Sequence, residues 1–371
     1  MKQGWEIKKL GEICEVLNGY AFKSELYTNE GVRVMRITNV QKGYIVDNDP
    51  KFYSEQDMAP IQQYLLREND LLMSLTGNVG RVGILQKDML PAALNQRVAC
   101  LRIKNSSLSN NYLFYLLNSN RFEGDAIFSA TGIAQKNMST EWLKKYNIPI
   151  PPLAEQEKIV EELDCLSGII EKKREQLKEL DALAQSIFYT MFGDPITNEK
   201  GWEVKPLKDV ALLKAGKAIK ASELSEEPNA SLYPCFGGNG IRGYISKKSH
   251  CGQYPIIGRQ GALCGNVVFA QGEFYATEHA VVCNNIISSI NPLWLYYALR
   301  YNNLNRFAQG VAQPGLSVSI INEMPLIYPP LTLQQEFAEK IALIEKQKEL
   351  IKQSIAETEE LFNERMNYYF N

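Results

Sequence analysis

The chain carries the same pattern twice. The heptapeptide GWEIKKL at positions 4–10 returns as GWEVKPL at 201–207, an offset of 197, and the tripeptide PPL at 151–153 returns at 329–331, an offset of 178. Solenoid repeats are much shorter, roughly 20–50 residues, so the pattern indicates a duplicated domain. A chain with two related but diverged domains can bind two similar, non-identical partners at a fixed separation.

Each copy ends in a segment typical of a long helix, over residues 155–192 and 334–370. Apolar residues recur there at steps that alternate between four and three, which is the pattern of a coiled-coil seam. Lys173 interrupts the first seam, and Lys348 and Thr358 interrupt the second. We expect the two helices to pack antiparallel within one chain, because a narrow apolar seam is unstable in water. The predicted packing residues are Ile159, Leu163, Leu166, Ile170, Leu177, Leu180, Phe337, Ile341, Ile344, Ile351 and Ile355.

The globular part of each copy is expected to mix helices and strands. Short apolar or alternating runs near glycines, such as residues 32–37 and 98–103, predict strands. Residues 112–117 and 294–299 predict two matching short helices. The expected fold class is therefore α+β, with two similar mixed domains, each followed by a long helix, and the two helices forming an antiparallel coiled coil. The predicted boundaries are 1–150 and 194–330 for the globular domains, and 151–193 and 331–371 for the helices.

Composition narrows the class of protein. No apolar run reaches the roughly 18 residues that a membrane span requires, and the first residues lack the apolar core of a signal peptide. We therefore predict a cytoplasmic protein without a membrane partner. The seven cysteines include no C-x-x-C pair, which predicts reduced, mostly buried thiols and neither a disulfide framework nor a metal site.

The charge distribution permits contact with a polyanion. The net charge is −2, but both globular segments carry a small excess of basic residues and both helical segments a small excess of acidic ones. A mildly basic surface is compatible with phosphate binding by the globular domains.

The residues of a catalytic centre are not evident. The only two histidines, His250 and His279, both lie in the second copy, and no phosphate-binding G-x-x-x-x-G-K-[ST] loop occurs. The FGGNG segment at 236–240 resembles the glycine loop of S-adenosylmethionine-dependent methyltransferases, and NPLW at 291–294 resembles their N-P-P-[YFW] motif. A turn and a helix cap explain these two segments at least as well. We predict no catalytic residue.

Two polar segments repeat between the copies. GIAQKNMS at 132–139 aligns with GVAQPGLS at 310–317, and SLTGNVGR at 74–81 aligns with GRQGALCG at 258–265. Gln can contact adenine in a bidentate manner, and Lys and Ser reach base edges or phosphates; the alternatives are a turn capped by Ser and a plain β-hairpin turn. The candidate DNA contacts are Arg36, Thr76, Arg81, Arg97, Gln135, Lys136, Asn137, Lys217, Lys220, Arg242, Arg259, Gln313 and Ser317.

With these segments, the chain resembles the specificity subunit of type I restriction–modification systems. The resemblance covers essentially the full length and includes PPLAEQE at 151–157 and MFGDP at 191–195. It implies two target-recognition domains, each reading half of a bipartite, asymmetric site in double-stranded DNA, joined by helices that set the spacing. It also implies two modification subunits with S-adenosylmethionine and restriction subunits with ATP and Mg, while this chain holds no cofactor. The alternatives are a DNA adenine methyltransferase with its own active site and a non-catalytic coiled-coil adaptor that binds proteins.

Overall fold

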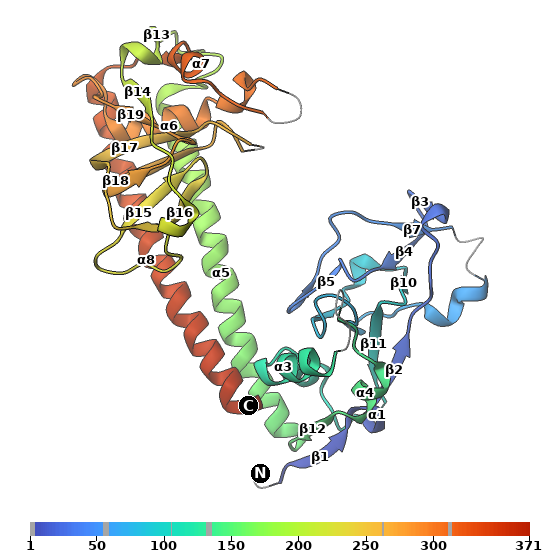
Figure 1. Cartoon of the computed structure of the whole chain (residues 1–371). Helices are drawn as coiled ribbons and strands as arrows, with labels where there is room; N and C mark the ends of the chain where they lie inside the picture. Colours follow the sequence, from blue (N-terminus) through green and yellow to red (C-terminus); the bar gives the residue numbers. More distant parts are fainter. Residues whose placement is uncertain (1–3, 55–58, 105, 131–135, 262, 311–313) are drawn as a thin grey trace. The chain divides into compact units, whose positions relative to one another are not determined.

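The computed structural model describes residues 4–54, 59–104, 106–130, 136–261, 263–310 and 314–371. The chain divides into two compact units (Figure 1): unit 1 comprises Met1–Lys173 and Ser354–Asn371, and unit 2 comprises Arg174–Gln353. The long helices α5 (Leu153–Phe192) and α8 (Leu331–Phe370) are divided between the units, so each helix contributes one segment to unit 1 and another to unit 2. This division cuts both helices, so it does not test the domain boundaries expected from the sequence. Those boundaries, which separate two globular domains from two helices, stay a prediction.

Unit 1 contains two four-stranded sheets. The first has the order β2 (Cys14–Asn18), β11 (Val98–Ile103), β8 (Leu71–Ser74), β9 (Val82–Ile84), with antiparallel neighbours throughout. The second has the order β10 (Ala92–Leu94), β4 (Val32–Met35), β7 (Phe52–Tyr53), β3 (Tyr27–Thr28). The remaining elements are the pair β1 (Glu6–Lys9) and β12 (Asn147–Ile150), the hairpin β5 (Val40–Gln41) and β6 (Tyr44–Ile45), and helices α1 (Leu10–Ile13), α2 (Asn110–Leu117), α3 (Asn120–Ser129) and α4 (Thr140–Lys145).

Unit 2 repeats the first of these sheets and extends it. Its six strands have the order β14 (Leu212–Ala215), β19 (Ala280–Asn284), β17 (His250–Gly258), β18 (Val267–Ala276), β15 (Tyr233–Gly237), β16 (Gly240–Ile245). The first four of them correspond to β2, β11, β8 and β9. The remaining elements are the pair β13 (Val204–Pro206) and β20 (Pro325–Ile327), and helices α6 (Pro292–Tyr301) and α7 (Val318–Asn322).

The helices begin earlier than the sequence predicts, directly after each Pro-Pro pair. A fully buried glutamine in each first turn explains the position. The Gln156 side chain accepts from the backbone N–H of Ser109 at 2.7 Å and donates to the carbonyl oxygen of Pro151 at 2.9 Å. Gln334 does the same in unit 2, with Asn291 at 2.9 Å and Pro329 at 2.8 Å. Each long helix is thereby bonded to the residue that caps α2 or α6.

Truncating this glutamine should destabilise its unit. Gln334→Ala removes three hydrogen bonds from a buried site and leaves buried backbone groups without partners, which costs about 1–3 kcal/mol. The control is the exposed neighbour Gln335→Ala, for which a change within about 0.5 kcal/mol is expected. Urea unfolding of both variants measures the difference. Equal midpoints would show that the hydrogen bonds of Gln334 do not stabilise the unit.

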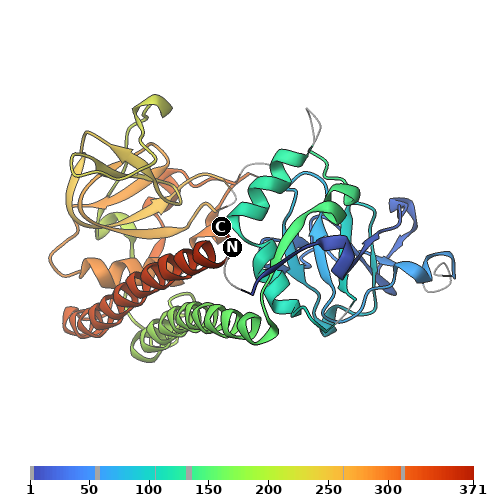
Figure 2. The same cartoon turned by 90° about the horizontal axis from the view of Figure 1, so that it is seen from below.

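The two long helices pack antiparallel within each unit. In unit 1, Arg365 donates to Glu162 and Lys173 Nζ donates to Ser354 Oγ at 2.6 Å. The residue numbers therefore rise along α5 while those of their partners fall along α8. In unit 2 the rings of Phe188 and Phe337 lie 5.5 Å apart. Figure 2 shows the two helices running beside each other. The predicted antiparallel pairing is confirmed.

The predicted seam residues differ in burial. The seam ends belong to the cores of the globular parts: Ile159 and Leu163 join the main core of unit 1, and Phe337, Ile341 and Ile344 that of unit 2. Ile170 is also buried, whereas five seam residues are half-buried: Leu166, Leu177, Leu180, Ile351 and Ile355.

The polar interruptions of the seam form contacts between the helices. Lys173 Nζ donates to Ser354 Oγ and, at 3.1 Å, to Thr358 Oγ1. Lys348, only 8% exposed, donates to Asp181 Oδ1 at 2.8 Å. A buried ammonium group needs such partners to offset the loss of its hydration, so the breaks in the apolar pattern mark polar links.

Candidate nucleic-acid interface

In unit 1 the two repeated polar segments lie side by side, together with a third turn. The backbone N–H of Leu75 donates to the carbonyl oxygen of Arg97 at 2.9 Å, and that of Met138 donates to the carbonyl oxygen of Leu75 at 2.8 Å. The N–H of Gly77 donates to Lys136 O at 2.9 Å. We call residues 75–77, 95–97 and 136–138 the first edge.

Unit 2 repeats this arrangement bond for bond. Arg259 N–H donates to His279 O at 3.1 Å, Leu316 N–H to Arg259 O at 2.8 Å, and Gly261 N–H to Pro314 O at 3.1 Å. We call residues 259–261, 277–279 and 314–316 the second edge. Gly77 and Gly261 both have a positive φ, of 73° and 86°, a conformation that favours glycine. The two repeated polar segments supply two of the three segments of each edge, and the candidate Arg97 lies in the third segment of the first edge. The structure brings these segments together.

Serines at the ends of these loops cap helices. Ser317 Oγ accepts from the N–H of Ile320 at 3.2 Å and lies 2.7 Å from Ser319 Oγ. Ser139 likewise caps α4, accepting from Glu141 and Trp142. The capped turn considered as an alternative is therefore present at Ser317. Gln135 and Gln313 lie outside the described residues.

The other candidates of unit 1 differ in their exposure and in their contacts within the unit. Arg97, Lys136 and Asn137 are exposed on the first edge. Thr76 is only 9% exposed and lines, with Arg81, a cavity of about 320 Å³. Two arginines are held within the unit: Arg81 Nη1 donates to Gln41 Oε1 at 2.7 Å, and Arg36 lies 3.5 Å from an Asp49 carboxylate oxygen. Arg36 and Arg81 are thus tied to neighbouring loops.

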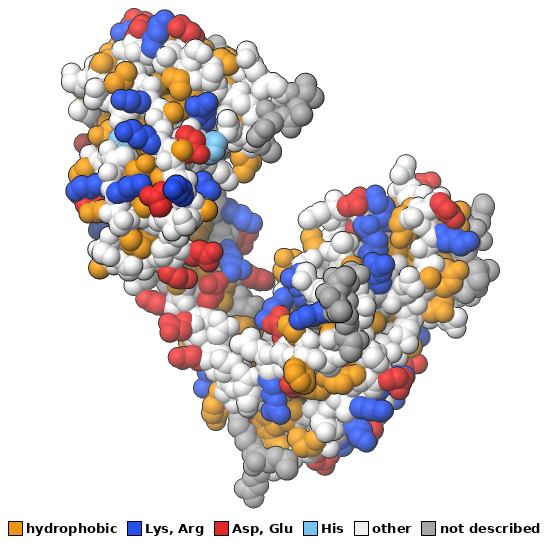
Figure 3. Space-filling view, viewed as in Figure 1, with side chains coloured by type: hydrophobic (Ala, Val, Ile, Leu, Met, Phe, Trp, Pro, Cys, Tyr) orange, Lys and Arg blue, Asp and Glu red, His pale blue; other side chains and the backbone are white. Residues whose placement is uncertain are grey.

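The basic candidates of unit 2 have fewer contacts within their unit than Arg36 and Arg81 have in unit 1. Lys217, Lys220 and Arg242 are exposed, and none of them forms an ion pair within the described ranges. Figure 3 shows Lys and Arg side chains gathered on the viewed face of this unit. The backbone N–H of Lys217 donates to Ala276 O at 3.2 Å, which places Lys217 next to the second edge. Arg259, half-buried, belongs to that edge.

Gln260 lies in a segment that the sequence singled out, but it is not among the candidates. In the third segment of each edge the sequence missed the remaining polar residues, which are Asn95, Gln96, Thr277, Glu278 and His279. The turns 95–97 and 277–279 occupy equivalent places, but their offset of 182 differs from the 184 between the glycine turns. A comparison of the residues that precede β11 and β19 is the only signal that could have found them.

The methyltransferase-like segments have structural roles. Gly237 ends β15 and Gly240 begins β16, so the glycines form a hairpin turn. A Cβ on Gly238 would lie 3.1 Å from the carbonyl oxygen of His279, which explains why a glycine packs there. Asn291 caps α6 through the N–H groups of Leu293 and Trp294. The expected turn and helix cap are confirmed.

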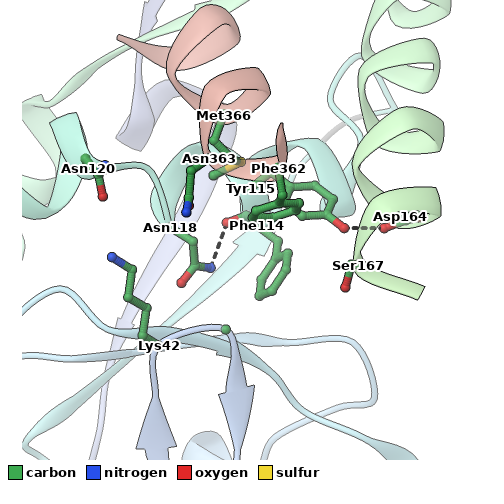
Figure 4. A pocket seen from close by; sticks show the side chains of 11 residues that line it. Lys42, Phe114, Tyr115, Asn118, Asn120, Asp164, Ser167, Phe362, Asn363 and Met366 are labelled. Atoms are coloured by element: carbon green, nitrogen blue, oxygen red, sulfur yellow. Dashed lines mark hydrogen bonds between the residues drawn. The ribbon is translucent and has the colours of Figure 1, made fainter. Parts of the chain in front are cut away.

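Each unit also has a hollow beside a long helix. In unit 1 it measures about 390 Å³ and is lined by residues of α2, α5 and α8 (Figure 4). Tyr115 donates there to Asp164 Oδ1 at 2.5 Å, and burial, together with this bond, raises the pKa of Tyr115. Unit 2 has a hollow of about 680 Å³ lined by residues of β17, β18, α6 and α8. None of the candidate DNA contacts lines either hollow.

The cysteines, the helices and the clustering of acidic, His and Cys side chains relate to the expectations about disulfides, membrane spans and metal sites. All seven cysteines are free, and five of them are buried. No helix in the described ranges combines the length and apolar composition needed to span a bilayer. Within the same ranges, no group of three His, Cys, Asp or Glu side chains gathers to hold a metal ion.

Comparison with known proteins shows the class. The model of the type I restriction modification DNA specificity domain matches residues 2–181 and again 199–360. The chain belongs to this family, whose members are recognition subunits without an active site of their own. The two matches agree with the two similar units and with the expected fold class.

Individual relatives cover most of the chain. It is 33% identical over 352 residues to the EcoprrI type I restriction enzyme specificity subunit of Escherichia coli, covering 88% of this chain and 84% of that one. The S subunit of a type I restriction–modification system from M. genitalium has the same fold, with a TM-score of 0.62 at 16% identity over 99% of this chain and 96% of that one. A chain from a study of type I R-M complex assembly gives a TM-score of 0.57 at 18% identity, over 100% and 98% of the two chains.

Proposed function

We propose that this chain reads a two-part, asymmetric site in double-stranded DNA, with one half-site bound by each unit. The observation that carries the proposal is the edge that occurs twice with the same backbone bonds and different side chains. Repeated backbone geometry presents side chains in the same manner in both units. Different side chains then select different base pairs, since base edges carry the sequence information.

Basic residues around the edges would supply the sequence-independent part of binding. Lys136 in unit 1 and Lys217, Lys220 and Arg242 in unit 2 are exposed. Neutralising phosphates releases counterions, which stabilises the complex in a salt-dependent manner. This contribution orients the edges on the duplex but does not select a sequence.

The partners belong to the same proposal. Two modification subunits that bind S-adenosylmethionine would contact the long helices and methylate adenine, and restriction subunits would add ATP- and Mg-dependent translocation and cleavage. The chain itself would hold no cofactor and direct these subunits to the site. A cytoplasmic location is part of this proposal, because the DNA to be read lies there.

The edges should respond differently to loss of a base contact and of a phosphate contact. Gln260→Ala should reduce the discrimination at one base pair of the second half-site by roughly 1–3 kcal/mol. Gln135→Ala and its repeat Gln313→Ala should each do the same in the half-site of their own unit. Lys136→Ala should weaken binding to all sequences and reduce the salt slope by about one. Fluorescence anisotropy of the full chain on duplexes altered in one half-site at a time measures both effects.

The control is Lys158→Ala, an exposed lysine on the long helix α5, which should leave sequence preference and salt slope unchanged. Equal affinity of the unaltered chain for all duplexes would contradict the proposal and favour a protein-binding adaptor. If Gln135→Ala and Gln313→Ala left both half-site preferences intact, the repeated loops would be structural turns, and the same result for Gln260→Ala would make the second edge one.

A further inference from the structure

The second edge concentrates polar groups that lack partners. Among the described residues, seven buried side-chain polar atoms have no hydrogen-bond partner, and four of them belong to this edge: Arg259 Nε, Thr277 Oγ1, Glu278 Oε2 and His279 Nδ1. Buried polar groups are nearly always bonded in native structures. Their concentration at one half-buried edge indicates a place where a ligand completes the bonding.

Three of these four groups lie on the turn 277–279, which has a fixed backbone and in which the side chains of Glu278 and His279 are partly exposed. Thr277 N–H donates to Phe236 O at 2.9 Å, and Ala280 N–H donates to Thr277 O at 3.0 Å. The side chains of Glu278 and His279 are 37% and 40% exposed. His279 Nε2 lies 3.1 Å from Glu278 Oε1, which leaves the second carboxylate oxygen as an acceptor without a donor.

The charge of Glu278 limits which part of DNA it can bind. Exposed Lys217 lies beside this turn, so phosphates are expected near the second edge. A carboxylate repels phosphate and accepts hydrogen bonds only. Amino groups on base edges are the DNA donors that it can use, and cytosine N4 is the one that Glu typically contacts in the major groove.

We propose that Glu278 reads a cytosine in the second half-site by accepting a hydrogen bond from its N4 amino group, while Arg259 donates to a guanine of the same half-site. This inference rests on the proposed function and names the chemistry that unit 2 selects. In the free chain His279 holds the carboxylate at the edge. On binding, the Glu278 carboxylate turns toward the duplex, and Oε2, which no donor of the described chain reaches, accepts from the amino group of the base.

The equivalent turn of unit 1 carries a different side chain at the position proposed to contact a base. Leu75 bonds to Arg97 as Arg259 bonds to His279, and Gly19 and Gly216 both press against the backbone of these turns. Gln96 therefore stands where Glu278 stands in unit 2. A glutamine amide both donates and accepts, which suits adenine N6 and N7. The two half-sites then differ at this position because the amide and the carboxylate differ.

The test is the isosteric exchange Glu278→Gln in the full chain. Duplexes are first selected from a randomised pool by the unaltered chain, which yields its two half-sites. Glu278→Gln should then lose roughly 5- to 150-fold in affinity for the original second half-site and gain preference for adenine at one position. Glu278→Asp should keep the cytosine preference with weaker binding. The control Glu226→Gln makes the same change of charge at an exposed loop of unit 2.

Each result supports or overturns the assignment of Glu278 to a cytosine. A shift at one base pair of the second half-site, with the first half-site unchanged, supports the inference. A uniform gain of affinity for all duplexes, equal to that of Glu226→Gln, overturns it, since the carboxylate would then act only on phosphates. Unchanged half-sites in Glu278→Gln also overturn it while leaving the proposed function intact. Failure of the unaltered chain to select any sequence would instead remove the proposed function.

Discussion

Replacing Ile344 by aspartate is expected to destabilise unit 2 by about 3–5 kcal/mol, because it leaves a charge without a partner in a buried site. Ile344 is 7% exposed and belongs to the main core of the unit, with Phe337 and Ile341. Urea unfolding, with hydrogen exchange to locate the loss of protection, measures the effect. Protection of peptides from α6 should fall together with that of α8.

The neighbouring residue provides a matched control. Leu343 is 72% exposed on the same helix, so Leu343→Asp should change stability by no more than about 0.5 kcal/mol. Leu166→Asp should fall between the two, since Leu166 is half-buried. Equal effects at positions 343 and 344 would contradict the packing of α8 described above.

Lengthening both long helices by one heptad should change the gap in the recognised DNA site. Seven residues inserted between Lys173 and Arg174 in α5, and seven between Gln353 and Ser354 in α8, keep the seam in register. They add about 10 Å to each helix at 1.5 Å per residue, roughly three base pairs at 3.4 Å each. Methylome sequencing of a host that carries the altered chain with its partner subunits should show a longer gap and the same two half-sequences.

The control for the insertion is a loop of unit 2. Seven residues added among the exposed positions 226–228 lie outside the helices, so the gap should stay unchanged. A helix insertion that left the methylated motif as before would show that the helices do not set the spacing. A change in either half-sequence would show that the insertion disturbs the edges themselves.

Local patterns were sufficient to predict the fold class. The repeated GWE and PPL segments predicted the duplication, because two copies of one sequence adopt one fold. The alternating steps of four and three predicted both helices to within three residues of their ends, since side chains at that spacing lie on one face. Even the lysines that break the seam were visible, although their partners Ser354 and Asp181 were not.

The contacts between distant segments depended on the tertiary structure. The sequence located the glycine turn at 74–81 and the loop at 132–139, but not that Leu75 bonds both to Met138 and to Arg97. Nor did it predict that Ile159 and Phe337 pack into the globular cores. Pairing between strands far apart in the chain leaves no periodic trace in either strand.

The sequence by itself determined the class of protein, the duplication and the two helices, because each depends on residues close together in the chain or on a repeat of them. Only the tertiary structure decided which polar residues share an edge. Glu278 and Gln96 carry no local motif, and they became candidates because hydrogen bonds between remote backbones place the turns 277–279 and 95–97 at equivalent positions. The sequence encodes those bonds only through the fold as a whole.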